Sequence, residues 1–394
     1  MSEPAQPDLG GKTILQIIPD LSAGGAERTT LEMAEAIVAA GGTALVISEG
    51  GRMLDALEAA GGENIRLNVS TKNPFKVLSN AGKIAKIIEQ RGVDLVHARS
   101  RAPAWSAYWA ARRTQTPFVT TYHGAYSGVS GLKKFYNSVM ARGELVIANS
   151  EWTAAHVRSV HEIANERIVT IPRGVDFAQF DPERVSAERV KAMRDSWNIP
   201  ADDKRLTMTL PGRLTAWKGQ RVAIEALARL TGPEREGLHL VLPGDAQGRT
   251  SYVEDLEALI DAEGLGEQVS IVGHCEDMPA AYLASDIVLA PSSRPEAFGR
   301  VAAEASAMGK PVIVADHGGQ REIVVEGETG ARVAPGNAAE LAGAIRAMLQ
   351  LGPDGRASMG KAGQEWVRAR FSKEGLQAAT LNVYNQLLEK REDS

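Results

Sequence analysis

Short apolar runs alternate with longer amphipathic stretches along the first half of the chain. The apolar runs are rich in β-branched residues and predict strands at 13–19, 43–48, 93–98, 117–123, 144–150 and 167–172. The stretches 29–41 and 79–92 carry apolar residues at helical spacing and predict helices between these strands. Strands that are apolar on both faces are typical of a parallel sheet covered by helices, so we predict a repeating βαβ arrangement.

The same rhythm starts again in the second half of the chain. Further strands are predicted at 205–213, 238–244, 269–273, 286–292 and 310–316. The segment 173–185 between the two series is rich in Asp, Pro and Gly and is predicted to be a linker. We therefore expect an α/β protein with two doubly wound, Rossmann-like parallel-sheet domains that face each other across a cleft. The last stretch, 372–392, has an apolar stripe and predicts a packed helix.

Composition places the chain among soluble globular proteins. It has 394 residues, of which 44% are hydrophobic and 24% charged, and its net charge of −5 argues against general affinity for nucleic acid. Its single cysteine, Cys275, cannot form an internal disulfide, which favours a reducing compartment. The Cys275 thiol is either a catalytic group or, more commonly for cysteine, a buried small hydrophobe.

Targeting signals are not expected in this chain. The first residues contain no basic region followed by an apolar run, so we predict no signal peptide. No apolar run approaches the ~20 residues that a membrane-spanning helix needs. We therefore expect the protein in the cytoplasm or on the cytoplasmic face of a membrane.

The loop PDLSAGGAER (19–28) lies between a predicted strand and a predicted helix. Gly24 and Gly25 allow a close backbone approach, and the following helix offers free amides, so phosphate is a suitable ligand. A tight structural turn explains the glycines equally well. The loop lacks the G-x-G-x-x-G spacing of dinucleotide-binding domains, which argues against a nicotinamide dehydrogenase.

Two further loops carry charged residues after predicted strands. Arg213 and Lys218, in PGRLTAWKGQ (211–220), could neutralise a diphosphate leaving group, or they could be a solvated basic loop. In SSRPEAFGRVAAEASAMGKPV (292–312), Glu296 and Glu304 could each hold a pair of sugar hydroxyls, or they could be surface glutamates. Gly299 lies near the predicted helix start, where backbone amides are free to meet an anion.

His123 ends a strand of the first series, in TTYHGAYSG (120–128). We expect it to point into the cleft and to contact a transferred sugar or an acceptor. Taken alone, a histidine in this position is more often a structural residue with satisfied hydrogen bonds.

Together these segments resemble the retaining glycosyltransferases of family 4, which have the GT-B fold. The resemblance covers nearly the whole chain and rests on the GGAER loop, the GRL…WKG segment, the PEAFG…E pair with seven residues between the glutamates, and HGGQREIV (317–324). The glutamate pair with its flanks is the most specific of these motifs. The implied domains are 1–173 for the acceptor, 174–371 for the nucleotide-sugar, and 372–394 as a helix that crosses back to the first domain.

The resemblance also implies a role for each candidate residue at the donor. Arg213 and Lys218 would hold the diphosphate, Glu296 would bind hydroxyls of the donor sugar, and Glu304 would bind the ribose. Phe298 and Gly299 would offer backbone contacts to phosphate and sugar, and Gly24 and Gly25 would meet the donor phosphate or the acceptor through backbone amides. The backbone near His274 and Cys275 would meet the nucleobase.

The implied reaction keeps the configuration of the donor's anomeric carbon, beside which His123 would lie. Diphosphate departs first and the acceptor hydroxyl attacks the same face. The chain has no Asp-x-Asp motif, so cations are expected to replace a metal, and we expect no metal and no cofactor. Uridine is the expected base. One departure is Arg173, since the family commonly has Asn-Gly-Val-Asp where this chain has Arg-Gly-Val-Asp (173–176).

Other classes of protein remain open from the sequence. A two-domain nucleotide-sugar epimerase or a phosphorylase has the same architecture, although a phosphorylase would need a lysine that binds pyridoxal phosphate. A non-catalytic nucleotide-sugar-binding protein is the second alternative. The four charged donor residues argue against it.

Charge is distributed unevenly, and this bears on the acceptor. The stretch from Arg66 to Arg142 has 13 Lys or Arg against two acids, Glu89 and Asp94, a balance of +11. Aromatic residues are interleaved with these cations, and 131–142 resembles a basic interfacial helix. We therefore expect the first domain to dock on an anionic membrane and to reach a lipid-linked or lipopolysaccharide-core acceptor. A solvated basic face is the alternative, and single-stranded nucleic acid is disfavoured.

Overall fold

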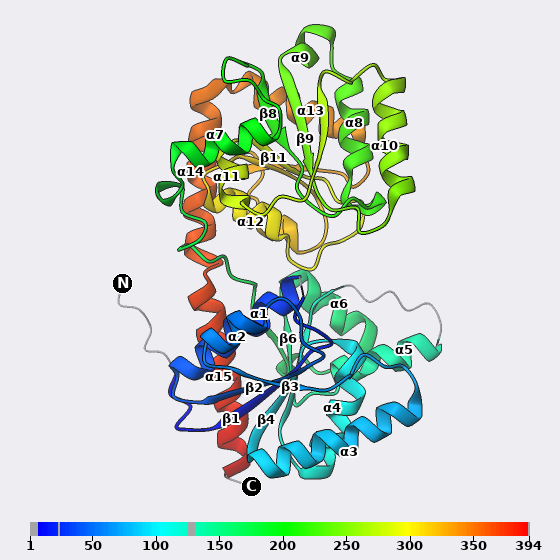
Figure 1. The fold of residues 1–394 in the computed structure, drawn as a ribbon, viewed down its shortest axis with the longest axis vertical. Coiled ribbons are helices and arrows are strands. Elements are labelled where there is room, and N and C mark those ends of the chain that lie inside the picture. Colours follow the sequence, from blue (N-terminus) through cyan, green and yellow to red (C-terminus); the bar gives the residue numbers. More distant parts are fainter. Residues whose placement is uncertain (1–6, 23, 125–130, 393–394) are drawn as a thin grey trace. The chain divides into compact units, whose positions relative to one another are not determined.

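The computed structural model describes residues 7–22, 24–124 and 131–392. The chain forms two compact units (Figure 1). The N-terminal unit comprises Met1–Gly174 and Lys373–Ser394, and the C-terminal unit comprises Val175–Ser372. Tyr126, one of the interleaved aromatics, and the end of the 120–128 segment lie outside the described residues.

The N-terminal unit contains a seven-stranded parallel sheet with the order β3-β2-β1-β4-β5-β6-β7. Its register aligns Thr13 with Thr43 on one side and with Val93 on the other. The strands are β1 (Thr13–Ile17), β2 (Thr43–Ser48), β3 (Glu63–Arg66), β4 (Val93–Ala98), β5 (Phe118–Tyr122), β6 (Leu145–Ala148) and β7 (Ile168–Thr170).

Helices cover both faces of this sheet because successive strand residues point to opposite sides. Leu15 and Ile17 face one core with α3, α4 and α6, whereas Ile14 faces a second core with α1 and α15. The helices are α1 (Gly25–Ala39), α2 (Leu54–Ala59), α3 (Pro74–Arg91), α4 (Arg101–Thr114), α5 (Gly131–Ser138), α6 (Glu151–His161) and α15 (Lys373–Glu392), with 3-10 turns η1 (Val139–Ala141) and η2 (Asn165–Arg167).

The last helix of the chain, α15, packs beside α1 in the N-terminal unit (Figure 1). Its apolar stripe is buried, and Tyr384 is fully enclosed. The Gln377 amide donates to the Glu32 carbonyl at 2.7 Å, and the Tyr384 hydroxyl lies 2.7 Å from His97 Nδ1. The helix is therefore part of the core of this unit.

The C-terminal unit contains a six-stranded parallel sheet with the order β10-β9-β8-β11-β12-β13. Val312 is aligned with Val288 on one side and with Gly330 on the other. The strands are β8 (Leu206–Thr209), β9 (Leu238–Pro243), β10 (Val269–Gly273), β11 (Ile287–Ala290), β12 (Val312–Ala315) and β13 (Gly330–Val333).

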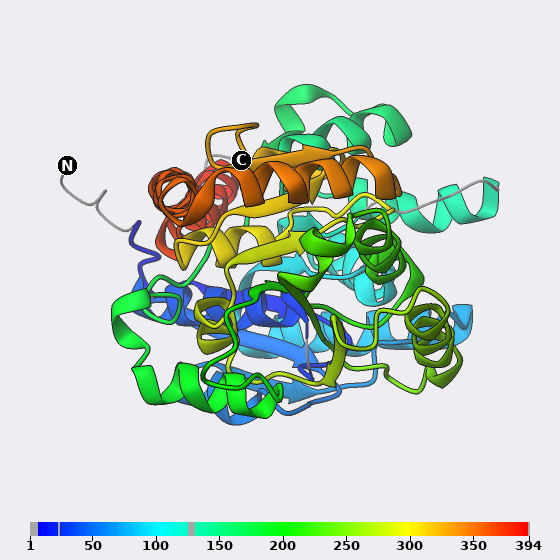
Figure 2. The same ribbon diagram turned by 90° about the horizontal axis from the view of Figure 1, so that it is seen from above.

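This second sheet is also covered on both faces (Figure 2). Ile313 packs with α8, α10 and α13, whereas its neighbours Val312 and Val314 pack with α12 and α14. The helices are α7 (Ala187–Ser196), α8 (Gln220–Ala228), α9 (Gly232–Glu236), α10 (Thr250–Ala262), α11 (Met278–Leu283), α12 (Arg300–Ala307), α13 (Ala338–Gln350) and α14 (Gly352–Arg370), with 3-10 turns η3 (Pro182–Arg184), η4 (Ala216–Lys218) and η5 (Gly319–Glu322). The prediction of two doubly wound parallel-sheet domains is confirmed.

The structure differs from the sequence prediction at several elements. Strands β3 and β13 were not predicted, because both lie at a sheet edge and are short and partly polar. The helix predicted over 131–142 ends at Ser138 and continues as a 3-10 turn. The predicted linker 173–185 is mostly folded into the C-terminal unit, because Val175 and Phe180 are buried there.

No helix among the described residues is both long enough and apolar enough to cross a bilayer.

Candidate functional site

Each sheet has a point where the strand order reverses, and ligands of open α/β sheets bind beyond the carboxyl ends of strands at such points. In the C-terminal unit the order reverses between β8 and β11. The loop after β8 carries Arg213 and Lys218, and the loop after β11 carries Glu296 and Gly299. The two charged motifs of this unit therefore meet at the reversal point.

Lys218 and Glu296 form an ion pair at this point. Lys218 Nζ lies 2.9 Å from Glu296 Oε1, and the two side chains are 14% and 16% exposed. The Ser292 hydroxyl also donates to Glu296 Oε1, and the Lys218 ammonium lies 4.6 Å from the centre of the Trp217 ring. The pair is thus held at mostly buried positions by contacts within and between the two loops.

Arg213 lies in the same loop but is exposed. Its carbonyl oxygen accepts a hydrogen bond of 3.1 Å from the Gln220 amide, which fixes the backbone of the loop to the start of α8. The guanidinium therefore stays at the surface, where it can meet an anion.

Close backbone contacts shape the loop that holds Glu296. Gly319 N donates to the Glu296 carbonyl at 2.7 Å. A Cβ at Gly319 would lie 2.3 Å from the Ala297 carbonyl oxygen, and one at Gly299 would lie 2.5 Å from Gln320 Cβ. Gly299 also has φ of 112°, which favours glycine. The backbones of segments 295–299 and 317–319 are therefore packed tightly against each other.

Glu304, which lies within α12, contacts one residue of α11 and one of its own helix. The hydroxyl of Tyr282, a fully buried residue of α11, donates to Glu304 Oε2 at 3.1 Å, and Arg300 Nη1 lies 3.7 Å from Glu304 Oε1. Burial and the neighbouring carboxylate raise the pKa of Tyr282 well above its usual value, so the hydroxyl stays protonated as a donor. Glu296 lies in the loop before α12, so the helical repeat does not determine whether its side chain points the same way as that of Glu304.

The remaining donor candidates differ in their surroundings. Phe298 is buried and packs edge-on against Phe371, so its side chain belongs to the core. His274, directly after β10, is exposed. Cys275 is half-buried with its sulfur 3.8 Å from that of Met193, and burial, together with Asp277, raises the pKa of the thiol to about 11. A thiol with this pKa is a poor nucleophile, which favours a packing role.

The strand order of the N-terminal unit reverses between β1 and β4. Gly24 and Gly25 follow β1, and Arg99 follows β4. Gly24 has φ of 141°, a backbone conformation that favours glycine. A Cβ at Gly25 would lie 1.8 Å from Arg173 Nη1, so this glycine makes room for a guanidinium.

His123 directly follows β5 and is paired with Arg173. Arg173 Nη2 donates to His123 Nδ1 at 3.0 Å, which leaves the ring proton on Nε2. Burial, and then the charges of Arg173 and Arg99, hold the pKa of His123 well below its usual value, so the ring is neutral at pH 7. Nε2 is buried and has no hydrogen-bond partner among the described residues. It is therefore a donor available to a ligand.

Sequence reasoning missed the residues that orient these groups. Tyr282 and Ser292 hydrogen-bond to the two glutamates, and Arg173 was identified only as a departure from the family pattern. A tyrosine within a helix and a serine in a loop carry no sequence signal of this kind. Within the described part of the chain, no group of three or more His, Cys, Asp or Glu is arranged to hold a metal ion.

Comparison with known proteins gives matches to both halves of the chain. The family model described as Glycosyltransferase Family 4 matches residues 23–179, and the model described as Glycosyl transferases group 1 matches residues 191–366. A D-inositol 3-phosphate glycosyltransferase of Xylanimonas cellulosilytica is 30% identical over 313 residues, which cover 76% of this chain and 73% of that protein.

Solved structures are similar over almost the entire chain. The crystal structure of a glycosyltransferase from Rickettsia africae has 36% identity and a TM-score of 0.88, and the match covers 96% of this chain and 99% of that one. Anabaena HepE in complex with UDP-glucose has 25% identity and a TM-score of 0.80, with 97% and 100% covered.

Proposed function

The chain belongs to the glycosyltransferases of family 4, and on that premise we propose that it is a retaining hexosyltransferase. Its donor would be a nucleotide-sugar, UDP-sugar first, and its acceptor a lipid-linked or lipopolysaccharide-core glycan at the cytoplasmic face of a membrane. The observation that carries the proposal is the placement of the Lys218–Glu296 pair at the reversal point of the C-terminal sheet.

The chemistry of the site supports a nucleotide-sugar donor. Arg213 and Lys218 supply two positive charges for a diphosphate, and the carboxylates of Glu296 and Glu304 suit the adjacent hydroxyls of a hexose and a ribose. The similar Anabaena protein was crystallised with UDP-glucose, which makes this compound the first donor to test.

In the proposed reaction, the bond from the anomeric carbon to the diphosphate breaks first. Arg213, Lys218 and backbone amides offset the negative charge that develops on the leaving group, and preorganised groups of this kind usually make the largest contribution to catalysis. The acceptor oxygen then bonds to the same face of the sugar, and its proton passes to the departing phosphate. No side-chain base is needed for this step.

His123 would act as a hydrogen-bond donor to the sugar. Its neutral ring presents an Nε2 proton, and the Arg173 guanidinium at Nδ1 opposes protonation of the ring. A neutral histidine positions a hydroxyl without adding positive charge beside an anomeric carbon that itself becomes positive.

Two kinds of acceptor follow from different observations. The basic stretch 66–142 with its aromatic residues favours a lipid-linked acceptor at an anionic membrane. The similar Xylanimonas protein is described as acting on D-inositol 3-phosphate, which favours a small phosphorylated polyol. Incubation with UDP-glucose and each acceptor class, followed by mass spectrometry of the products, distinguishes the two.

The donor site is tested by thermal shift and by slow hydrolysis of UDP-glucose. A ligand that binds only the folded state raises its stability. We expect Glu296→Gln and Glu304→Gln to lose most of the shift and the hydrolysis, and Glu328→Gln, at an exposed position of the same unit, to retain both. Equal behaviour of the three variants would contradict the proposal.

The same assay separates an enzyme from a non-catalytic binding protein. Wild-type protein that shows a thermal shift with UDP-glucose but no hydrolysis, and no transfer to any acceptor class, would be a binding protein. Hydrolysis that is lost in Glu296→Ala excludes that alternative.

A further inference from the structure

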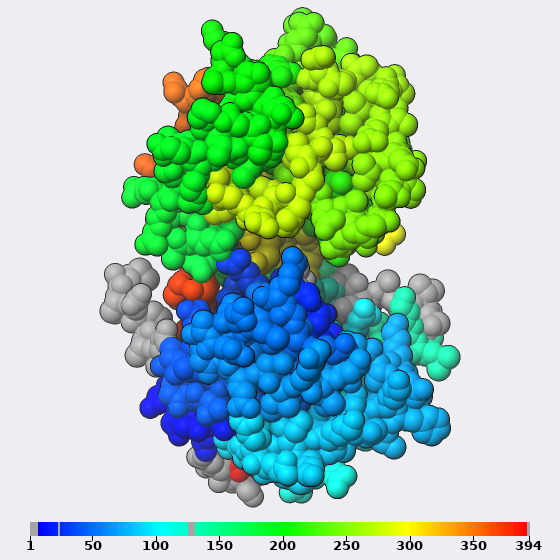
Figure 3. Space-filling view, in the orientation of Figure 1, coloured from blue at the N-terminus to red at the C-terminus, as the bar shows by residue number. Residues whose placement is uncertain are grey.

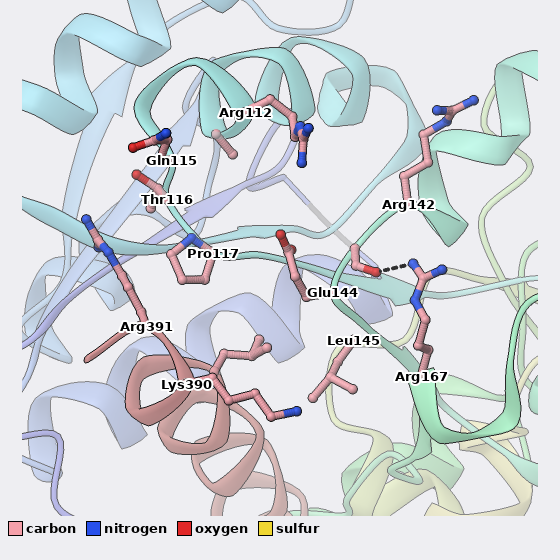
Figure 4. Close-up of a pocket in the computed structure, with 13 residues that line it drawn as sticks. Arg112, Gln115, Thr116, Pro117, Arg142, Glu144, Leu145, Arg167, Lys390 and Arg391 are labelled. Atoms are coloured by element: carbon pink, nitrogen blue, oxygen red, sulfur yellow. Dashed lines mark hydrogen bonds between the residues drawn. The ribbon is translucent and has the colours of Figure 1, made fainter. Parts of the chain in front are cut away.

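Figure 4 shows a cationic cavity in the N-terminal unit, beside the amino ends of β5 and β6. Its volume is about 770 Å³. Pro117 and Leu145, where β5 and β6 begin, form part of the wall, whereas His123 follows the other end of β5. The cavity is therefore separate from the site assigned to the donor and acceptor.

Five positively charged side chains and one carboxylate line this cavity. Arg112 comes from α4, Lys390 and Arg391 come from the end of α15, and the others are Arg142, Arg167 and Glu144 (Figure 4). Arg167 donates to the carbonyls of Ala141 and Gly143, and Arg391 donates to that of Asp94 at 3.3 Å. Neutral carbonyls orient these guanidiniums but do not neutralise them.

The positive charge exceeds what the surrounding backbone requires. Arg112, Lys390 and Arg391 lie in the last turns of α4 and α15, where cations complement the helix dipole. Two helix ends supply about one negative charge in total, and Glu144 supplies another, so roughly two of the four arginine charges remain in excess even when Lys390 is left out of the count. No ion pair formed between described residues involves Arg112, Arg142 or Arg391. The excess charge suits a phosphate.

An exposed apolar surface adjoins the cavity through one shared residue. The Arg142 guanidinium lines the cavity and also lies 5.2 Å from the Trp105 ring and 6.0 Å from the Phe135 ring. Phe135 stacks on Trp105 with centroids 5.0 Å apart and is still 59% exposed. Leu132 of α5 is 85% exposed and Trp109 of α4 is 48% exposed. Tyr108 lies 5.7 Å from the same guanidinium, and we call Tyr108, Trp109, Leu132 and Phe135 the aromatic patch; Trp105, only 8% exposed, supports it from the core.

The exposed apolar residues are concentrated in this unit. Among the described residues, five of the six large hydrophobics that are strongly exposed lie on α3, α4 and α5 of the N-terminal unit, and α3 occupies the lower right of the face shown in Figure 3. Contiguous exposed apolar groups, such as those of the aromatic patch, mark an interaction surface. A soluble anion would explain the cavity alone, but it would leave the adjoining aromatic patch in water.

We propose that this cavity binds the headgroup phosphate of an anionic phospholipid while the aromatic patch enters the interfacial layer of the membrane. Basic pockets bind lipid headgroups, and tryptophan and phenylalanine favour the membrane interface. The inference deepens the proposed function by placing the membrane contact on defined residues. The lipid held there is an anchor and takes no part in sugar transfer.

The chain offers a matched pair of variants to test this. Arg112 and Arg113 are consecutive, exposed cations in the last turn of α4, but only Arg112 lines the cavity. Arg112→Glu and Arg113→Glu therefore change net charge and helix-end electrostatics equally. Full-length protein is sedimented with vesicles of phosphatidylcholine alone and with vesicles that also contain phosphatidylglycerol. Binding of glycerol 3-phosphate is measured by calorimetry.

We expect wild-type protein to bind the phosphatidylglycerol vesicles and Arg112→Glu to bind them at least about tenfold more weakly, since this variant loses a charge-assisted contact to the headgroup phosphate inside the cavity. Arg113→Glu should stay within about threefold of wild type. Equal loss in both variants would reveal general charge attraction and overturn the proposal. So would absence of vesicle binding by wild type, or tight glycerol 3-phosphate binding without vesicle binding. UDP-glucose thermal shifts on the same preparations report separately on the donor site.

Discussion

Removal of one hydroxyl group tests the assignment of Glu304 to the donor. Tyr282→Phe deletes the group that donates to Glu304 Oε2 at 3.1 Å and leaves the volume of the fully buried side chain almost unchanged. Glu304 itself is not altered, and Arg300 remains 3.7 Å from its other oxygen. Any change in donor binding then reflects the orientation of the carboxylate.

The expected magnitude follows from the surroundings of this bond. Hydrogen bonds to charged groups contribute about 1.5–3 kcal/mol. The Glu304 side chain is 14% exposed, so water and Arg300 can partly replace the lost donor, and we expect the low end of that range. Because this bond is already present without ligand, its energy is first a loss of folding stability, and UDP binding weakens only as far as the carboxylate loses its orientation, by roughly tenfold at most. Tyr282 would thus act as a positioning residue.

The assay is calorimetric titration with UDP, paired with urea unfolding. Tyr384→Phe is the matched control, because Tyr384 is also fully buried and its hydroxyl also hydrogen-bonds, to His97 in the N-terminal unit. Both variants should lose stability, but only Tyr282→Phe should bind UDP more weakly. If UDP affinity stays within twofold in Tyr282→Phe, the reasoning that Glu304 is oriented for the donor is refuted.

Three further predictions concern stability and metal dependence. The pKa values of His97 and His123 are held well below their usual range, first by burial and then by nearby cations, so the unfolded chain takes up these protons at a higher pH than the folded chain. The free energy of unfolding should therefore fall as pH drops below about 6.5, by about 1.4 kcal/mol per pH unit for each histidine. In His123→Gln, the free energy of unfolding from urea titrations should fall less steeply with decreasing pH than in wild type, and an equally steep fall would contradict this. Gly319→Ala should cost about 1–3 kcal/mol, because its Cβ would lie 2.3 Å from the Ala297 carbonyl oxygen, whereas Gly343→Ala, with open space in α13, should be neutral or stabilising; equal effects in urea unfolding would refute the steric argument. Sugar transfer should persist in EDTA, and a loss of turnover that magnesium or manganese restores would overturn the assignment of the diphosphate to Arg213 and Lys218.

The architecture could be predicted from the sequence because buried parallel strands are apolar on both faces. The edge strands β3 and β13 lack this signal, since an edge strand is partly exposed and tolerates polar residues. The burial of Val175 also escaped prediction, because it depends on pairing with Ser372, almost 200 residues away in the chain. Periodicity reports local exposure and carries no information about which distant segment covers a residue.

The candidate site was predictable to a similar degree. Charged residues after strands are recognisable because the carboxyl ends of parallel strands share one edge, so Lys218 and Glu296 could be expected near each other. Their direct ion pair could not, because it depends on side-chain geometry across two loops. The pairing of Arg173 with His123 has the same origin, since 50 residues separate them.

The contribution of α15 to the N-terminal unit has a consequence for synthesis of the chain. The ribosome completes Val175–Ser372, the whole of the C-terminal unit, before the residues of α15 emerge. Until then, the face of α1 that later contacts Leu381 and Tyr384 has no cover. Synthesis of the N-terminal unit therefore begins first but is completed last, and a nascent chain or a fragment that stops at Gly174 exposes apolar surface that is prone to aggregation.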